Sequence, residues 1–208
     1  MVISDILSPI TGVIHVGASE GQERGIYSQF DIDVLWFEPL PSAYKKLQQN
    51  LISLPKQRAF QYAISSYTGP ALLHVTDNEG QSSSIRELYM HKDVWPDVHQ
   101  IDTIRVHTIT LDSFFERTGI FKERFQVLVL DAQGSELDIL KGATEILPYI
   151  KYAQIEMMDF EAYKGGALAV DIIAFMEKNG FKEIGRELLF PAESALRSDN
   201  VFFERITT

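Results

Sequence analysis

Cysteine is absent from this 208-residue chain, which excludes thiolate catalysis, zinc–thiolate centres and a disulfide-built scaffold. Long apolar runs are missing too, because no stretch approaches the length that spans a membrane. The first twelve residues contain Asp5 and Pro9 and no basic cluster, unlike a signal peptide. We therefore expect a soluble, cytoplasmic protein without a membrane span.

Clustered positive charge is also lacking. The 19 Lys and Arg residues face 29 Asp and Glu residues, which gives a net charge of −10. The basic residues are scattered, and Lys45 and Lys46 come nearest to a cluster. Because nucleic-acid binding relies on clustered Lys and Arg, we expect no nucleic-acid partner. The length and the apolar content of 45% predict a single domain over residues 1–208.

The most informative pattern lies near the N-terminus. An apolar run at 13–16 ends in a turn that contains Gly17 and Gly21, and a second run at 34–37 ends in Glu38. Glycines let backbone N–H groups approach a ligand, and a carboxylate at a strand end can accept both hydroxyls of a ribose. This layout is typical of a nucleotide-type site at the carboxyl edge of a parallel sheet.

The glycine spacing narrows the choice of ligand. Gly17-x-x-x-Gly21 is not the Gly-x-Gly-x-x-Gly turn of dinucleotide binders and carries no pyrophosphate signature. A nucleoside such as S-adenosylmethionine is therefore favoured. The alternative is that both glycines only allow tight packing of a strand against a helix.

Strand and helix patterns alternate along the chain. Apolar runs and period-two alternation predict strands at 13–16, 34–37, 58–64, 71–75, 101–108, 125–130, 152–155, 181–189 and 200–205. Helical spacing predicts helices at 22–30, 41–54, 111–121, 135–147 and 167–178. The pattern predicts an α/β fold with a doubly wound, mainly parallel seven-stranded sheet and an antiparallel C-terminal strand. Residues of about 77–100 form an irregular insertion, and the strand at 71–75 is expected to return beside the third strand.

Several motifs follow one another in a specific order. They are His15-Val-Gly17-Ala-Ser19-x-Gly21, Trp36-Phe37-Glu38-Pro39, Thr110-Leu111-Asp112, Asp131-Ala-Gln133-Gly134-Ser135-Glu136 and Leu140-Lys141-Gly142-Ala143. The ordered set, from about residue 13 to 203, resembles the FkbM-type S-adenosylmethionine-dependent methyltransferases. The resemblance implies a Rossmann-like class I methyltransferase fold and methyl transfer to a hydroxyl, often of a sugar or a glycosylated product.

The resemblance also implies a cofactor site at these strand ends. We expect S-adenosylmethionine to contact His15, Gly17, Ala18, Gly21, Glu38, Pro39, Ala63, Ile64, Ser83 and Asp131. His15 departs from the family, which usually has an acidic residue there, and Ser19 stands where asparagine is usual. A neutral histidine can still accept from the methionine ammonium group. For Ala63 and Ile64, adenine contact and simple core packing are both open.

Asp131 is the first candidate for deprotonating the acceptor hydroxyl. It ends the most apolar strand, where we expect its carboxylate to be partly desolvated and thus a better proton acceptor. The alternative is a cap for the helix near Ser135. Glu156 at the neighbouring strand end is expected to share the task, and His91 is the second candidate base. With Asp159, Asp131 and Glu156 could instead hold Mg²⁺, although no tight carboxylate motif favours a metal.

The insertion is the expected acceptor site. Long irregular segments inside compact domains tend to be functional, and aromatic rings pack against the C–H faces of sugars. The candidates that bind a small-molecule or oligosaccharide acceptor are Ser84, Tyr89, His91 and Trp95. A solvated turn is the alternative for the serines, and an exposed residue without a role is the alternative for the histidine.

Two rival functions come from other classes. A nicotinamide-dependent oxidoreductase would share the sheet and Glu38 but would need the missing glycine turn. A non-catalytic interaction module could keep the fold without turnover. Only twelve residues precede the first strand, so we expect either a minimal enzyme or one domain of a longer chain.

Overall fold

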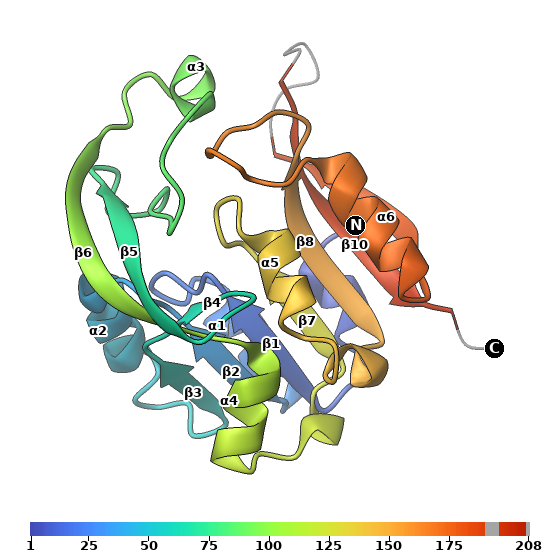
Figure 1. The fold of residues 1–208 in the computed structure, drawn as a ribbon. Helices are drawn as coiled ribbons and strands as arrows, with labels where there is room; N and C mark the ends of the chain where they lie inside the picture. The colour runs from blue at the N-terminus through green and yellow to red at the C-terminus, as the bar shows by residue number, and fades with distance from the viewer. Residues whose placement is uncertain (190–195, 207–208) are drawn as a thin grey trace.

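The computed structural model describes residues 1–189 and 196–206. Its main sheet has seven strands in the order β3-β2-β1-β7-β8-β10-β9 (Figure 1). They are β1 (Gly12–Val16), β2 (Asp33–Phe37), β3 (Gln57–Phe60), β7 (Val127–Leu130), β8 (Tyr152–Met158), β9 (Phe181–Leu188) and β10 (Ser198–Arg205). β10 pairs antiparallel with β8 and β9, and the pairs among the other strands are parallel. The predicted fold class is confirmed.

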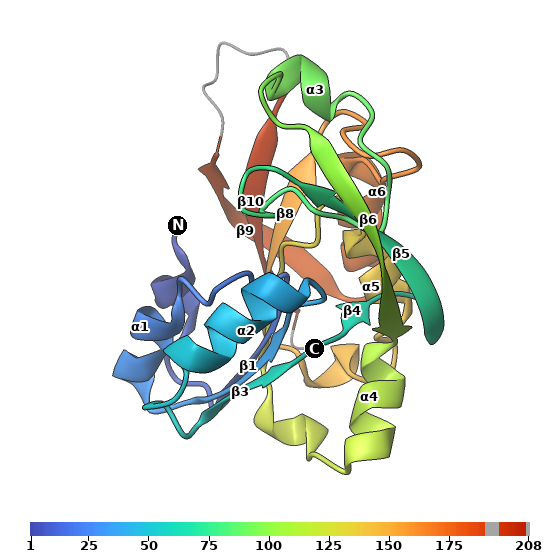
Figure 2. The same ribbon diagram turned by 90° about the vertical axis from the view of Figure 1, so that its left-hand side faces the viewer.

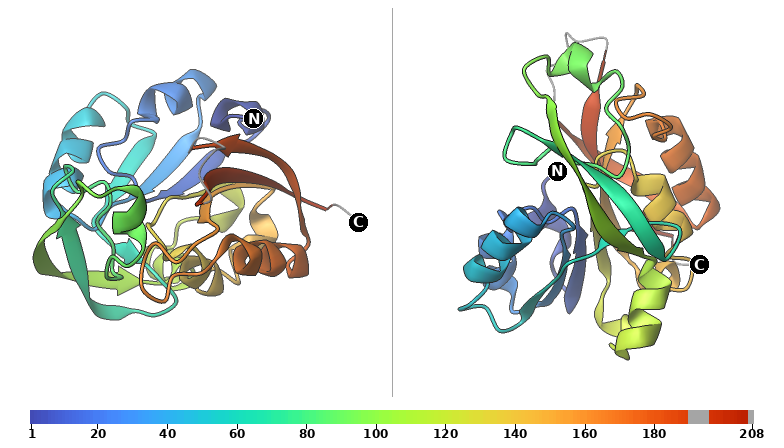
Figure 3. Two further views of the ribbon diagram at one scale, coloured as in Figure 1. Left: turned by 90° about the horizontal axis from the view of Figure 1, so that it is seen from above. Right: turned by 60° about the vertical axis from the view of Figure 1, so that its left-hand side comes forward.

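Helices cover both faces of this sheet (Figures 2 and 3). On one side lie α1 (Arg24–Tyr27) and α2 (Pro41–Asn50), and on the other α4 (Leu111–Thr118), α5 (Glu136–Lys141) and α6 (Ala169–Lys178). Successive strand residues point to opposite faces, so Val13 of β1 packs in one apolar cluster and Ile14 in the other. Burial on both faces explains the continuous apolar runs of the central strands.

A second, three-stranded sheet contains β4 (Ala63–Ile64), β6 (Gln100–Ile109) and β5 (Gly69–Thr76). The single strand expected at 58–64 is therefore wrong: the Tyr62 N–H bonds the Phe60 carbonyl, and the chain turns from β3 into β4. β5 does not return beside β3 but pairs antiparallel with β6 along its length. The small sheet stands beside the main one, with α3 (His91–Val94) at its far end (Figure 1).

Some helices are shorter than predicted. The helix expected at 135–147 ends at Lys141, because the Asp112 carboxylate accepts the backbone N–H groups of Glu145 and Ile146 and holds them outside a helix. The helix expected at 22–30 is only α1 followed by one 3₁₀ turn. The 3₁₀ turns are Ile3–Ile6, Ser28–Phe30, Lys122–Arg124 and Leu147–Tyr149. Within residues 1–189 and 196–206, no helix is long and apolar enough to cross a bilayer.

Candidate functional site

Three strand ends meet at the carboxyl edge of the main sheet. The Gly17 N–H bonds the Phe37 carbonyl at 3.1 Å, and the Asp131 N–H bonds the Val16 carbonyl at 3.0 Å, so the segments after β1, β2 and β7 lie together. A cavity of about 230 Å³ opens there. Of the residues predicted for the cofactor and acceptor, its lining includes His15, Gly17, Glu38, Pro39, Ala63, Ile64, Ser83, Ser84 and Asp131.

Gly17 lies where two backbones approach each other. Its φ of +83° favours glycine, and a Cβ at this position would lie 1.6 Å from the Asp131 carbonyl oxygen. Gly17 thus permits both the close strand ends and the cavity wall. Gly21 and Ala18 lie outside the lining: a Cβ on Gly21 would meet Leu47, and Ala18 is buried in the core. For Gly21 the packing alternative is the one that the structure supports.

Glu38 is a buried carboxylate at the cavity wall, only 7% exposed. One oxygen accepts the Ser19 N–H at 2.8 Å and the other accepts the Leu40 N–H at 2.7 Å. Burial raises the pKa of Glu38 to about 7, although the two backbone donors oppose the shift. The carboxylate is held rigidly and still lines the cavity.

His15 presents a neutral ring to the cavity. The imidazole stacks on Trp36 at 4.5 Å between ring centroids, and its Nδ1 lies 2.9 Å from the Tyr27 hydroxyl. Burial lowers the pKa of His15 to about 4, so the ring is uncharged at neutral pH. The ring is thus in the neutral form that an acceptor needs, and its contact with the methionine ammonium group stays a prediction.

Apolar residues form another part of the cavity lining. Ala63 and Ile64 of β4 are buried, belong to core clusters and also line the cavity, so core packing is shown and adenine contact stays a prediction. Tyr62 and Leu73 extend this apolar part. Such a surface suits the flat ring of a nucleoside base.

Asp131 lies in the turn after β7, and its surroundings correct one expectation. Its side chain is exposed rather than desolvated. Its Oδ1 accepts from the Gln133 Nε2 at 2.6 Å, and the same amide donates to Glu156 Oε2 at 2.9 Å. Glu156 stands inside β8 rather than at its end, outside the cavity lining. Burial and the nearby Asp131 charge raise the pKa of Glu156 well above its usual value.

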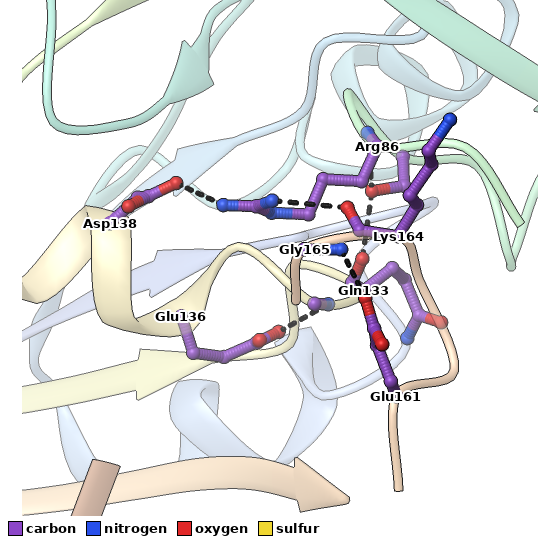
Figure 4. Close-up of polar contacts among 9 residues, drawn as sticks. Arg86, Gln133, Glu136, Asp138, Glu161, Lys164 and Gly165 are labelled. Atoms are coloured by element: carbon purple, nitrogen blue, oxygen red, sulfur yellow. Dashed lines mark hydrogen bonds and ion pairs between the residues drawn. The ribbon is translucent and has the colours of Figure 1, made fainter. Parts of the chain in front are cut away.

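Glu136 braces this turn, a role that sequence analysis missed. Its Oε1 accepts the Ala132 N–H at 2.8 Å and the Gly134 N–H at 3.2 Å, so Glu136 and not Asp131 takes up these backbone donors (Figure 4). Burial raises the pKa of Glu136 to about 7. An acidic residue in the first turn of a helix is usually exposed, so the sequence carried no signal for its burial.

Ser135 is a second missed residue. It is buried, it lines the cavity, and its Oγ has no hydrogen-bond partner among residues 1–189 and 196–206. Buried hydroxyls are usually paired, so this oxygen is suited to bind a ligand. The sequence analysis used Ser135 only to mark the start of a helix.

The insertion is tied to the turn after β7 and to the loop after β8. Ser84 Oγ donates to the Gln133 carbonyl at 2.7 Å. The Arg86 guanidinium reaches Asp138 of α5 at 2.5 Å and the Lys164 carbonyl at 3.2 Å (Figure 4). Ser83 and Ser84 therefore form part of a fixed cavity wall.

The aromatic residues of the insertion lie elsewhere. His91 is 1% exposed, stacks on Trp95 at 4.5 Å, and places its Nε2 3.1 Å from the Ser82 hydroxyl. Burial lowers the pKa of His91. Tyr89 is 50% exposed. None of Tyr89, His91 and Trp95 belongs to the cavity lining.

The cavity lining carries acidic side chains. In the described part of the chain, the lining contains Glu23, Glu38 and Asp131 but neither Lys nor Arg. Across residues 1–189 and 196–206, no group of three His, Cys, Asp or Glu side chains could hold a metal ion. Asp131, Glu156 and Asp159, which were the candidate ligands for Mg²⁺, therefore do not form such a group.

Comparison with solved structures defines the class. The magnesium protoporphyrin IX methyltransferase of Synechocystis PCC 6803, with bound S-adenosylmethionine, matches at a TM-score of 0.55 and 10% identity, over 98% of this chain and 74% of that chain. An rRNA methylase of Streptococcus thermophilus matches at 0.54 and 12% identity, over 98% and 92%. At these identities the likeness defines the fold alone, which is the Rossmann-like fold of S-adenosylmethionine-dependent methyltransferases.

Sequence comparison then defines the family. The model of the methyltransferase FkbM domain matches residues 15–183, so the chain belongs to the FkbM methyltransferase family. The 2-O-methyltransferase NoeI of Sinorhizobium fredii is 27% identical over 172 residues, which cover 79% of this chain and 70% of that protein. The resemblance seen in the sequence motifs is confirmed.

Proposed function

We propose that this methyltransferase uses S-adenosylmethionine to methylate a hydroxyl of a saccharide or glycoconjugate. The observation that carries the proposal is the acidic cavity at the strand ends, bounded by Gly17, Glu38 and Asp131. The relative that is named a 2-O-methyltransferase supports oxygen as the accepting atom.

The charge of the cavity favours this cofactor over a nicotinamide dinucleotide. S-adenosylmethionine carries a sulfonium and an ammonium group, which carboxylates attract, whereas a dinucleotide carries two phosphates that carboxylates repel. The lining described above offers Glu23, Glu38 and Asp131 and no basic side chain to a phosphate. The oxidoreductase alternative is therefore disfavoured.

The residues around the cavity fit the parts of this cofactor. Glu38 would accept the ribose hydroxyls, Ala63 and Ile64 would pack on the adenine, and Ser135 and Ser83, which also line the cavity, would bond the methionine carboxylate. His15 offers a neutral imidazole in place of an acidic residue.

The chemistry needs alignment and removal of one proton. S-adenosylmethionine supplies an activated methyl group on sulfur. Asp131 orients the acceptor hydroxyl and takes its proton as the oxygen bonds the methyl carbon, and the electron pair of the broken C–S bond stays on sulfur. Glu156 shares the task indirectly, because the Gln133 amide donates to both Glu156 and Asp131. His91, as the second candidate base, would require the insertion to rearrange.

The wall formed by the insertion supports a saccharide acceptor. Gln81 and Ser84 offer neutral hydrogen-bonding groups, which suit the hydroxyls of a sugar. Tyr89 remains the exposed aromatic candidate for stacking on an acceptor. A metal-independent reaction, a cytoplasmic location and the absence of a nucleic-acid substrate stay predictions.

Transfer of labelled methyl groups tests the proposal. The purified protein would be incubated with methyl-labelled S-adenosylmethionine and a panel of mono- and oligosaccharides, with and without Mg²⁺ and with an RNA control. We expect label in a base-stable ether of a saccharide. Label in RNA, or in nitrogen or carbon, would contradict the proposed acceptor. Binding of the cofactor without transfer to any member of the panel would favour the non-catalytic module.

A further inference from the structure

Gln133 adopts an unusual conformation beside the proposed base. Its φ is +53°, a left-handed value that is costly for a residue with a side chain. Its side-chain amide is fully bonded: Nε2 donates to Asp131 and to Glu156, and Oε1 accepts from the Tyr163 hydroxyl at 2.5 Å. A strained backbone and a saturated side chain at one residue indicate that this amide has a fixed position.

Tyr163 determines which way the amide points. Its ring is buried against Gly134, where a Cβ would lie 2.9 Å from that of Tyr163. Burial raises the pKa of Tyr163 well above its usual value, so the phenol keeps its proton and donates. Its oxygen lies 2.5 Å from Gln133 Oε1 and 3.3 Å from the Ser82 carbonyl, so Gln133 is the nearer of its two acceptors. The opposite orientation of the Gln133 amide would direct Oε1 at the Asp131 carboxylate. The tyrosine hydroxyl therefore selects the orientation in which the NH₂ group faces the two carboxylates.

The carboxylate pair explains what this amide can do. Two ionised carboxylates side by side repel each other, and burial further favours the neutral form of Glu156. Glu156 is therefore the member of the pair that tends to be neutral, and Asp131 is the member that lines the cavity. Donation from Gln133 to Oδ1 fixes the rotation of that carboxylate.

We propose that Gln133, held in place by Tyr163, is a positioning residue that orients the Asp131 carboxylate toward the acceptor hydroxyl. This inference rests on the proposed function, in which Asp131 takes the hydroxyl proton. Neither Gln133 nor Tyr163 needs to touch the transferred methyl group. Tyr163 comes from the loop after β8, 30 residues away in sequence, so the loop and the turn act together.

The hydrogen-bond part of the proposal can be tested without an acceptor. The side-chain amide of Gln133 would be observed by NMR and assigned from its loss in Gln133→Met. We expect the chemical shifts of both Gln133 side-chain N–H protons to differ from those of the exposed Gln49. In Tyr163→Phe these chemical shifts should move toward the Gln49 values. The matched control Tyr152→Phe, at the start of β8, removes a half-buried hydroxyl that bonds Glu204. It should leave the two Gln133 N–H resonances unchanged. Coincidence with Gln49 in the unmodified protein, or no change in Tyr163→Phe, would overturn the proposal.

Kinetics then test the consequence for the reaction. Tyr163→Phe should lower kcat about 10-fold and move the acidic limb of the pH profile to higher pH, while the KM for S-adenosylmethionine stays within about 2-fold. Tyr152→Phe should keep the kcat and pH profile of the unmodified protein. If Tyr163 only stabilised the fold, Tyr163→Phe would lower the fraction of active enzyme and leave the pH profile unchanged. That result would contradict the inference. Absence of cofactor binding in the unmodified protein would instead contradict the proposed function, and the NMR result would stand apart from it.

Discussion

The turns after β2 and β7 are built around the same device and use it differently. In each, a buried glutamate accepts two backbone N–H groups, and burial raises its pKa to about 7. Glu38 lines the cavity, whereas Glu136 does not, and the turn that Glu136 braces presents the exposed Asp131 instead. The comparison teaches that a buried carboxylate becomes a ligand-binding group or a structural brace according to its place relative to the cavity.

Substitution of Asp131 should have the largest effect. Asp131→Asn keeps the shape of the side chain but removes the proton acceptor, and general-base catalysis is typically worth 10²–10⁴-fold in rate. We expect kcat to fall by about that factor while the affinity for S-adenosylmethionine stays within a few-fold. Steady-state kinetics and calorimetry would measure both. Wild-type turnover in this variant would remove Asp131 from the mechanism.

Substitution of Glu38 should come next and should affect binding. Loss of a buried hydrogen-bonding partner costs about 1–3 kcal/mol, which corresponds to about 5- to 150-fold in Kd. Glu38→Ala should weaken binding of S-adenosylhomocysteine by that amount, and Glu38→Gln, which preserves the volume, should weaken it in the same direction. Glu136→Gln is the matched control and should bind within about 2-fold of the unmodified protein. An equal loss of affinity in Glu38→Ala and Glu136→Gln would contradict the different roles assigned to the two glutamates.

Glu136→Gln should instead change how stability depends on pH. A carboxyl group whose pKa is raised from 4.5 to about 7 on folding favours the folded state below pH 4.5, and this contribution is lost as the pH rises through 7. The amide cannot ionise, and its oxygen can still accept both backbone N–H groups. Relative to the unmodified protein, the variant should gain up to about 3 kcal/mol between pH 4.5 and pH 8.5.

Denaturant unfolding at the two pH values measures this gain. Glu116→Gln on the exposed face of α4 serves as the control and should show the same difference from the unmodified protein at both values. A Glu136→Gln variant that loses stability as the pH rises would mean that the ionised carboxylate is needed to brace the turn.

Ser135→Ala should have the smallest effect. Its Oγ has no hydrogen-bond partner in the part of the chain that the structure describes, so its removal should leave the free energy of unfolding unchanged or slightly raised. If the hydroxyl bonds the cofactor, its removal should cost about 0.5–1.5 kcal/mol in binding of S-adenosylmethionine. Calorimetry and denaturant unfolding on the same sample would separate the two quantities, and unchanged binding would remove Ser135 from the cofactor site.

The sequence was informative where function depends on position along a strand. Glu38 and Asp131 directly follow apolar runs, and parallel strands place their carboxyl ends at one edge, so both could be found without a structure. The alternation of strands and helices likewise predicts the doubly wound sheet.

Features that depend on contacts between distant segments could not be predicted from the sequence. His91 is buried because Trp95 and the distant Tyr163 enclose it, and no local pattern marks that contact. The division of 58–64 between two sheets depends on pairing with β6, whose residues lie some forty positions further on. Burial of Glu136 and the free hydroxyl of Ser135 also arise only when separate segments meet.

The most direct test of the central claim is calorimetric titration of the unmodified protein with S-adenosylmethionine and, separately, with NADH. Among the residues that the structure describes, the lining contains neither Lys nor Arg, so this acidic cavity should bind the cationic nucleoside with a micromolar Kd and should not bind the dinucleotide. Binding of NADH, or no binding of S-adenosylmethionine, would contradict the account.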